Sequence, residues 1–239
     1  MHDKFEPTRG GPRFCPQHAA VAPPCNVLGA AAPTDCRTDG QDPTASIRSG
    51  KSNAELPGVE LSRRWEWNPK TDTVSYEGKD KEGKPVKATY QRSQLGSQSD
   101  AIKNEIDPAF INDQYWLILP FHVVWDGATV TTDGAQKLSL SGASAERIVV
   151  KYPSDGGYEP GDTWDLYVGA DKRIVEIAYH HGANKPPKLV LATWADHKKA
   201  GPLLVATDHR GTFDGKPLRV SISDVSVKVT GSENWINAQ

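Results

Sequence analysis

The chain has 239 residues, of which 37% are apolar and 24% charged, a length that fits one large domain or two small ones. Its 28 Lys and Arg residues nearly balance 30 Asp and Glu residues, so the net charge of -2 provides no general attraction to phosphate backbones or anionic membrane surfaces. Pro120 and His122 interrupt the longest apolar run, Tyr115 to Trp125, which is shorter than the about 18 apolar residues that a membrane-spanning helix needs. Nucleic-acid binding and a transmembrane helix are therefore not expected.

The first 56 residues differ in composition from the rest of the chain. They contain seven of the 18 prolines, all three cysteines and only two aromatic residues. Such a segment buries too little apolar surface to offset the entropy of ordering its backbone, about 1–2 kcal/mol per residue. Residues 1–56 are therefore predicted to be a disordered arm rich in proline and glycine, and 57–239 one folded domain. No export signal is expected in the arm, because its apolar segment Val27–Ala32 is too short.

Alternating apolar and polar residues predict strands at the start of the folded part. A hairpin is expected around the polar turn Asn68–Asp72, with Leu61–Trp67 as its first strand and Thr73–Tyr76 as its second. A turn at Lys79–Lys84 then leads into the strand Pro85–Tyr90.

One stretch has helical instead of strand periodicity. Four residues have helical spacing after a cap at Ser99 and Asp100, namely Ala101, Ile102, Glu105 and Ile106. Asp107 and Pro108 then restart a helix, since an Asp cap followed by proline is typical of a first helical turn. Two short helices are predicted, with the aromatic run Tyr115–Phe121 linking them to the next strand.

Period-two alternation returns in the second half of the chain. It predicts six further strands, Arg147–Tyr152, Asp162–Val168, Ile174–Tyr179, Lys188–Trp194, Leu203–His209 and Leu218–Val229. In the last of these the apolar parity changes at Ser223 and Asp224, which indicates a bulge or bend. The predicted fold class is mainly β (α+β), a curved antiparallel sheet of about nine strands with a short helical lid over its concave face.

Three motifs resemble those of a known group of proteins. They are Asn112–Leu117 followed by Pro120-Phe121, Gly156–Asp162 running into Trp164–Val168, and Trp65–Thr71. Together they resemble uncharacterised bacterial proteins similar to LolA-type periplasmic lipoprotein carriers and outer-membrane lipoprotein-sorting proteins. The resemblance implies a half-barrel in which helices cover an apolar cavity that holds acyl chains, and a location in the periplasm or cell envelope.

Candidate catalytic and metal-binding residues are few. His180 and His181 are adjacent on a strand, so their side chains point to opposite faces and are not expected to share a metal ion. His197 and His209 each follow an aspartate where a strand is expected to end, which favours solvated strand ends. Neither a hydrolase, a zinc-protease nor a nucleotide-binding motif is present in the sequence, so no enzymatic activity, metal or cofactor is expected.

Aromatic residues are the more informative feature, because a curved sheet with a small lid leaves apolar surface that a ligand could cover. The residues expected to bind a ligand are Trp116, Leu117 and Phe121 at the cavity mouth and Trp164, Leu166 and Trp194 at its floor. The alternative is that all of them are ordinary core. The predicted function is non-enzymatic binding of a lipid, a lipoprotein acyl chain or another hydrophobic small molecule by a monomer. A protein or peptide interaction module that uses the same groove or a sheet edge is the alternative function.

Overall fold

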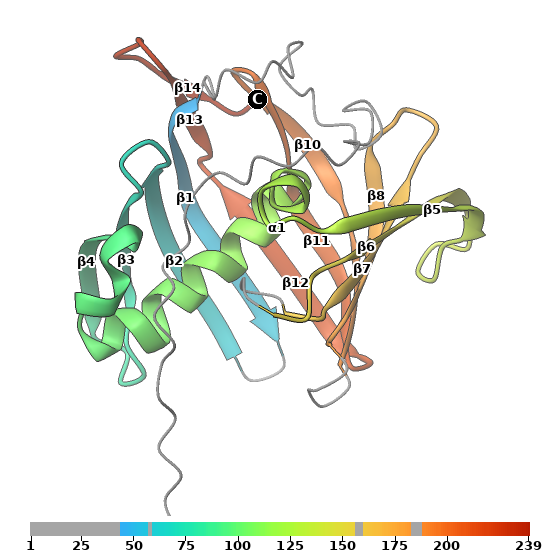
Figure 1. Cartoon of the computed structure of the whole chain (residues 1–239), viewed down its shortest axis with the longest axis horizontal. Helices are drawn as coiled ribbons and strands as arrows, with labels where there is room; N and C mark the ends of the chain where they lie inside the picture. The colour runs from blue at the N-terminus through green and yellow to red at the C-terminus, as the bar shows by residue number, and fades with distance from the viewer. Residues whose placement is uncertain (1–43, 57–58, 156–159, 183–187) are drawn as a thin grey trace, which may run out of the picture.

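The computed structural model describes residues 44–56, 59–155, 160–182 and 188–239, which form an antiparallel sheet with one long helix on one face (Figure 1). The strands are β1 (Thr44–Leu56), β2 (Val59–Asn68), β3 (Thr73–Lys79), β4 (Pro85–Gln91), β5 (Thr129–Lys137), β6 (Ser144–Lys151), β7 (Thr163–Val168), β8 (Ile174–His180), β9 (Leu189–Thr193), β10 (Ala195–Ala200), β11 (Leu203–Phe213), β12 (Lys216–Ser223), β13 (Ser226–Val229) and β14 (Trp235–Asn237). The helical elements are the 3-10 helix η1 (Arg92–Ser97), the π-helix η2 (Ile102–Ile106) and the α-helix α1 (Asp107–Trp125).

The sheet is open, with β4 and β5 at its two ends. The strand order is β4-β3-β2-β1-β12-β11-β9-β8-β7-β6-β5, and β10 and the β13-β14 hairpin pair with β11 and β1. The prediction of a mainly β, curved, antiparallel and open sheet is confirmed. The expected number of about nine strands is wrong, because the described part of the chain contains 14.

There are physical reasons why some strands are not predicted from the sequence. β5 is almost entirely exposed, so it has no alternation of apolar and polar residues to detect. The predicted bulge at Ser223 and Asp224 is confirmed: Asp224 has φ of 52°, and it divides the expected last strand into β12 and β13. β12 pairs with the second half of β1, and β13 pairs with its first half. The bulge therefore lets the segment from β12 to β13 remain paired with β1 along its length.

The predicted arm boundary at residue 56 is wrong for 44–56, because these residues form β1 in the middle of the sheet. β1 pairs with β2 on one side and with β12 and β13 on the other. Its sequence is largely polar, so its strand conformation comes from backbone pairing with its neighbours more than from its own side chains. Residues 1–43 lie outside the described residues, and their predicted disorder is untested.

The aromatic run Tyr115–Phe121 does not link a lid to a strand, as expected, but lies inside α1. The predicted cap at Ser99 is present, since the Ile102 N–H donates to its Oγ at 3.4 Å. α1 begins at Asp107 with Pro108 in its first turn, as expected, but no break precedes it, because the π-helical turn η2 continues directly into α1. One helix with a π-turn therefore replaces the two predicted helices.

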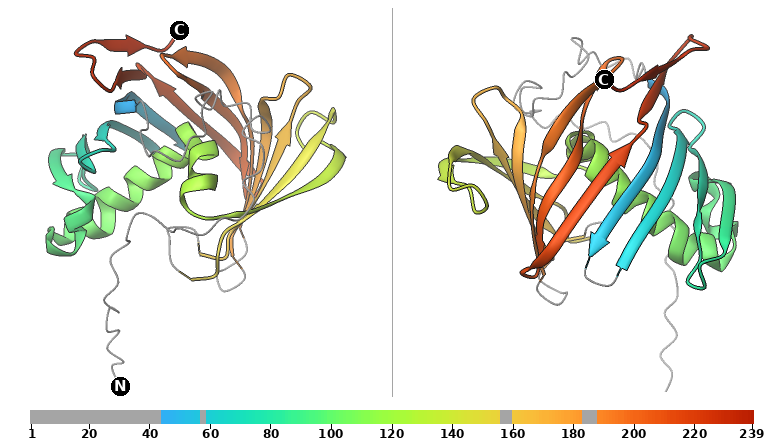
Figure 2. Two further views of the ribbon diagram at one scale, coloured as in Figure 1. Left: turned by 45° about the horizontal axis from the view of Figure 1, so that its top comes forward. Right: turned by 180° about the vertical axis from the view of Figure 1, so that it is seen from behind.

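α1 is kinked at Ile118, whose φ of -133° and ψ of 32° are not helical. The cause is Pro120, which has no N–H to bond the carbonyl of Trp116 four residues earlier. Two helical segments in different directions result, and Figure 2 shows the curved sheet wrapping around them. The seven consecutive residues 113–119 are all buried, which is almost two helical turns, so no side of this stretch faces solvent.

Gly211 marks the closest approach of two strands. It pairs with Ala192 of β9 and Leu218 of β12, and a Cβ at this position would collide with the carbonyl oxygen of Leu191. We expect Gly211→Ala to lower the free energy of unfolding by about 1–3 kcal/mol, because the backbone of β9 would have to shift. Urea denaturation measures this. Gly96→Ala is the matched control, since its Cβ would meet no atom within 4 Å, and a loss of equal size there would contradict the close-packing argument.

Candidate functional site

The residues predicted to bind a ligand all lie in the core between α1 and the sheet. Trp116 and Leu117 are buried on α1, Trp164 and Leu166 on β7, and Trp194 between β9 and β10, whereas Phe121 is partly buried. The structure thus places these six side chains on the predicted side of the sheet. Whether they contact a ligand stays a prediction.

Aromatic contacts hold the middle of α1 against the sheet. Trp116 stacks on Trp194 with ring centroids 5.8 Å apart, and both rings contact His209 of β11. One residue earlier, Tyr115 stacks on Trp164 at 5.9 Å. Trp116 and Trp164 are therefore occupied by contacts within the protein.

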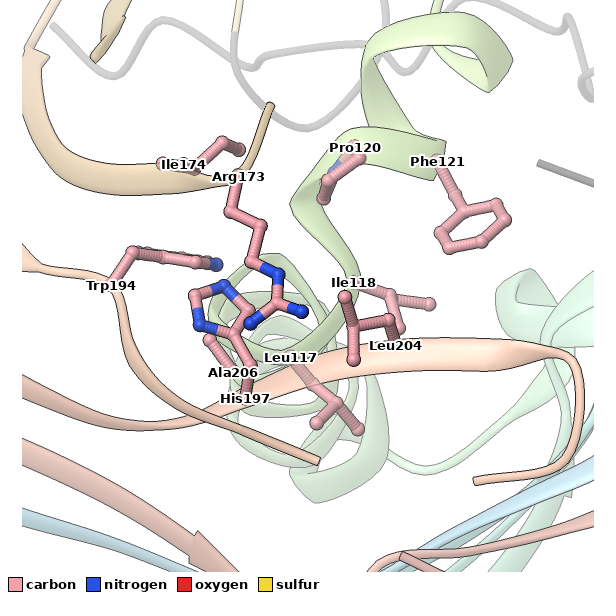
Figure 3. A pocket seen from close by; sticks show the side chains of 10 residues that line it. All are labelled: Leu117, Ile118, Pro120, Phe121, Arg173, Ile174, Trp194, His197, Leu204 and Ala206. Carbon is pink, nitrogen blue, oxygen red and sulfur yellow. The ribbon is translucent and has the colours of Figure 1, made fainter. Parts of the chain in front are cut away.

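A small apolar cavity lies beside the kink, where α1 changes direction (Figure 3). Its lining comes from α1, from the start of β8 and from β10 and β11, namely Leu117, Ile118, Pro120, Phe121, Arg173, Ile174, Trp194, His197, Leu204 and Ala206. Its volume of about 20 Å³ is enough for a single water molecule. The site is a small, mainly apolar pocket that is partly open to solvent in this conformation.

Three predicted residues, Leu117, Phe121 and Trp194, meet at this cavity, whereas Trp116, Trp164 and Leu166 do not line it. Sequence reasoning missed Arg173 and His197. Arg173 lies in the turn between β7 and β8, where a charged residue gives no sequence signal of a site. His197 was expected at a solvated strand end but is partly buried, because β10 continues beyond it to Ala200.

The N-terminal half of α1 is fixed to the sheet by two buried carboxylates. Asp113 accepts hydrogen bonds from Arg63 at 2.8 Å and from Trp65 Nε1 at 2.7 Å, both on β2. Burial raises the pKa of Asp113, and the Arg63 guanidinium and the Trp65 N–H oppose that rise. Asp107 accepts hydrogen bonds from Tyr90 at 2.9 Å and Arg92 at 3.0 Å.

The C-terminal half of α1 has no such ion pair with the sheet within the described ranges. Its polar contacts are internal: Asp126 accepts from Tyr115 at 2.7 Å and lies 3.0 Å from His122 Nδ1. Burial alone would raise the pKa of Asp126, but the hydrogen bonds from His122 and Tyr115 outweigh it and lower that pKa. Val124 and Trp125 at the end of α1 are 69% and 43% exposed. Among the described residues, the contacts that hold this half against the sheet are therefore mainly apolar and aromatic.

His209 is fully buried, so its predicted position at a solvated strand end is wrong: β11 continues to Phe213 and carries His209 into the core. Its Nδ1 lies 3.2 Å from the carbonyl oxygen of Thr193, and its ring contacts Trp116 and Trp194. Burial lowers the pKa of His209 to about 4, although the carbonyls of Thr193 and Trp116 act in the opposite direction. His209 is therefore a neutral core residue at pH 7.

We expect this histidine to make stability fall in acid. Between the ordinary pKa of 6.5 and the folded-state value of about 4 the unfolded chain binds a proton and the folded chain does not, so stability falls as the pH falls through that window. The contribution of His209 is on the order of 3 kcal/mol. Chemical denaturation of the wild type and of His209→Gln between pH 7 and pH 4 tests this. A pH dependence unchanged in His209→Gln, or removed equally by His180→Gln at the surface, would contradict it.

The remaining histidine candidates lie apart from the cavity lining. His180 is exposed, with its Nε2 3.1 Å from Asp165, and His181 contacts the ring of Tyr179, so the two adjacent side chains have different surroundings, as expected. Among the described residues, no three His, Cys, Asp or Glu side chains are grouped so that they could hold a metal ion. No helix in the same residues combines the length and apolarity needed to cross a membrane.

Solved structures that are similar to this chain include the following two. One is a DUF1329 family protein from Desulfovibrio piger, with a TM-score of 0.42 and 12% sequence identity over 80% of this chain and 89% of that one. The other is a LolA superfamily protein from Nitrosomonas europaea, with a TM-score of 0.44 and 8% identity over 79% and 88%. A LolA superfamily protein is thus among the structures that this chain resembles. No protein-family model and no curated protein sequence matches the chain.

Proposed function

We propose that the protein binds a hydrophobic ligand, a lipid or an acyl chain, between the kinked helix α1 and the concave face of the sheet, without a catalytic step. The observation that carries the proposal is the apolar cavity at the kink, where eight of ten lining residues are apolar or proline. Apolar pockets with a few polar groups at their rim are typical of small-molecule sites. The sequence motifs shared with lipoprotein carriers favour a location in the cell envelope.

The cavity must enlarge to accept an alkyl chain, and the structure of α1 indicates how. The segment before the kink is fixed by Asp107 and Asp113, whereas the segment from Leu119 to Trp125 forms no ion pair with the sheet in the described part of the chain. The break at Pro120 has already removed a helical hydrogen bond between the two segments. We therefore expect the second segment to move away from β8 and β10 when a ligand enters.

A partner strand at a sheet edge, one form of the alternative function, is opposed by the sequences of β4 and β5, the strands at the two ends of the strand order. β4 carries Pro85 and the exposed Lys87, and β5 has a register shift between Thr132 and Ala135. Proline, lysine and bulges on edge strands prevent pairing with other chains. The apolar cavity is therefore the better-supported site.

The test is isothermal calorimetry with a series of monoacylglycerols of increasing chain length, which differ only in apolar surface. If the chain enters an apolar site, affinity should rise about 4-fold with each added methylene until the site is full, since one buried methylene contributes about 0.8 kcal/mol. Absence of binding at every length, or a single affinity for all lengths, would contradict the proposal.

A matched pair of variants tests whether the ligand binds in the cavity. Leu204→Trp puts a larger side chain into the cavity lining and should weaken binding of the longer chains. Leu61→Trp makes the same change at an exposed position on β2 and should leave the series unchanged. Equal effects of the two changes would show that the ligand binds elsewhere.

A further inference from the structure

Among the described residues that line the cavity, Arg173 is the only charged one, and none is a carboxylate. Figure 3 shows its guanidinium beside the ring of His197, near Trp194, Ile118 and Leu204. The side chain is 47% exposed, so it lies where the cavity meets solvent. A cation at the rim and aliphatic side chains behind it give the site two chemically different ends.

Arg173 differs from the structural arginines of this protein. Arg63, Arg92 and Arg147 each lie within 3.0 Å of a buried aspartate that neutralises them. In the described part of the chain, the ion pair of Arg173 is with Asp171, at 3.7 Å, and that carboxylate is 60% exposed. An exposed pair at this distance contributes little, so the guanidinium keeps donors for another anion.

His197 adds a second nitrogen donor next to the guanidinium. Burial, followed by the positive charge of Arg173, lowers the pKa of His197, whereas Asp171 and Asp196 raise it. A neutral imidazole still offers one N–H donor. An anion placed against Arg173 would therefore meet a guanidinium fork and an imidazole at the rim of an apolar cavity.

We propose that Arg173 and His197 bind the anionic head group of an amphiphile, a carboxylate or a phosphate, whose alkyl chain enters the cavity beside the kink of α1. This inference rests on the proposed function and specifies its ligand class. Arginine is suited to the role, because its planar fork donates two parallel hydrogen bonds to a carboxylate or phosphate. The ligand class is an anionic lipid or fatty acid in preference to a neutral or cationic one.

The experiment compares four probes on the full chain by calorimetry, below their micelle concentrations: decyl phosphate, decanol, decyltrimethylammonium and inorganic phosphate. We expect decyl phosphate to bind at least about 10-fold more tightly than decanol, from one charge-assisted bidentate contact. The cationic probe should bind more weakly than decanol. Inorganic phosphate should bind weakly, since it has no chain.

Variants test whether Arg173 causes the preference for decyl phosphate over decanol. Arg173→Gln should bind decyl phosphate and decanol with equal affinity, and Arg173→Lys should keep part of the preference because it retains the charge. Arg64→Gln, an exposed position on β2, should keep all of it. Unchanged melting temperatures would show that each variant is folded.

The outcomes separate the two proposals. Equal binding of decanol and decyl phosphate by the wild type would overturn the head-group inference and leave the proposed function intact. If inorganic phosphate bound as tightly as decyl phosphate, the site would be one for free anions. This result would overturn the inference that the ligand is an amphiphile. Failure of all alkyl probes to bind would overturn the proposed function, and this inference with it.

Discussion

A chain that begins at residue 57 is expected to be unfolded, because it lacks β1. This strand pairs with β2 along one side and with β12 and β13 along the other, so its loss separates the β2-β3-β4 part of the sheet from the rest. It also removes the buried Ile47 from the core. Circular dichroism and thermal melting of the truncated chain should show no cooperative transition.

The matched control is a chain that begins at residue 44, which retains the whole of β1. We expect it to melt cooperatively near the temperature of the full chain, because residues 1–43 have the composition of a segment that buries little. A folded chain from residue 57 would contradict the central position of β1. An unfolded chain from residue 44 would show instead that the preceding residues contribute to the fold.

The second large effect is expected at Asp113. Asp113→Ala leaves the guanidinium of Arg63 and the N–H of Trp65 without their acceptor in the core, and we expect a loss of about 3–5 kcal/mol in the free energy of unfolding. Such a loss is a large part of the total stability of an ordinary domain, about 5–15 kcal/mol. Urea denaturation with circular dichroism measures it.

Asp133→Ala is the control, because Asp133 contacts Arg147 at 2.7 Å but is half-exposed. We expect it to cost less than about 1 kcal/mol. The double variant Arg63→Met with Asp113→Leu should be more stable than Asp113→Ala, since neither partner is then left unpaired. A small effect of Asp113→Ala would mean that apolar packing alone fixes the first half of α1.

The sheet could be predicted where one of its faces is buried. The second half of β2 and strands β3, β7 and β12 have apolar and polar residues in alternation, and the change of parity at Ser223 and Asp224 correctly indicates a bulge. β1 and β5 could not be found in this way. Their strand conformation depends on backbone pairing with neighbours that are distant in the sequence, and pairing leaves no pattern in the side chains of an exposed strand.

The candidate site could be predicted only in part. The prediction places Leu117 at the mouth of a cavity and Trp194 at its floor, and both line the cavity at the kink. The run Tyr115–Phe121 is apolar on every side, so it shows no helical periodicity, although a helix that is enclosed on all sides has such a sequence. Arg173 lines the cavity from the turn between β7 and β8. The alternation of apolar and polar residues predicts strands, but it does not predict where a turn places its side chains.

The central claim is that an alkyl chain lies between α1 and the concave face of the sheet. It is tested most directly by isotope-filtered nuclear Overhauser measurements between unlabelled decyl phosphate and isoleucine methyl groups carrying carbon-13. Ile118 on α1 and Ile174 on β8 line the cavity, and the account predicts that the chain protons give cross-peaks to both. Cross-peaks only to the exposed Ile236 of β14, with none to Ile118 and Ile174 at saturating ligand, would contradict it.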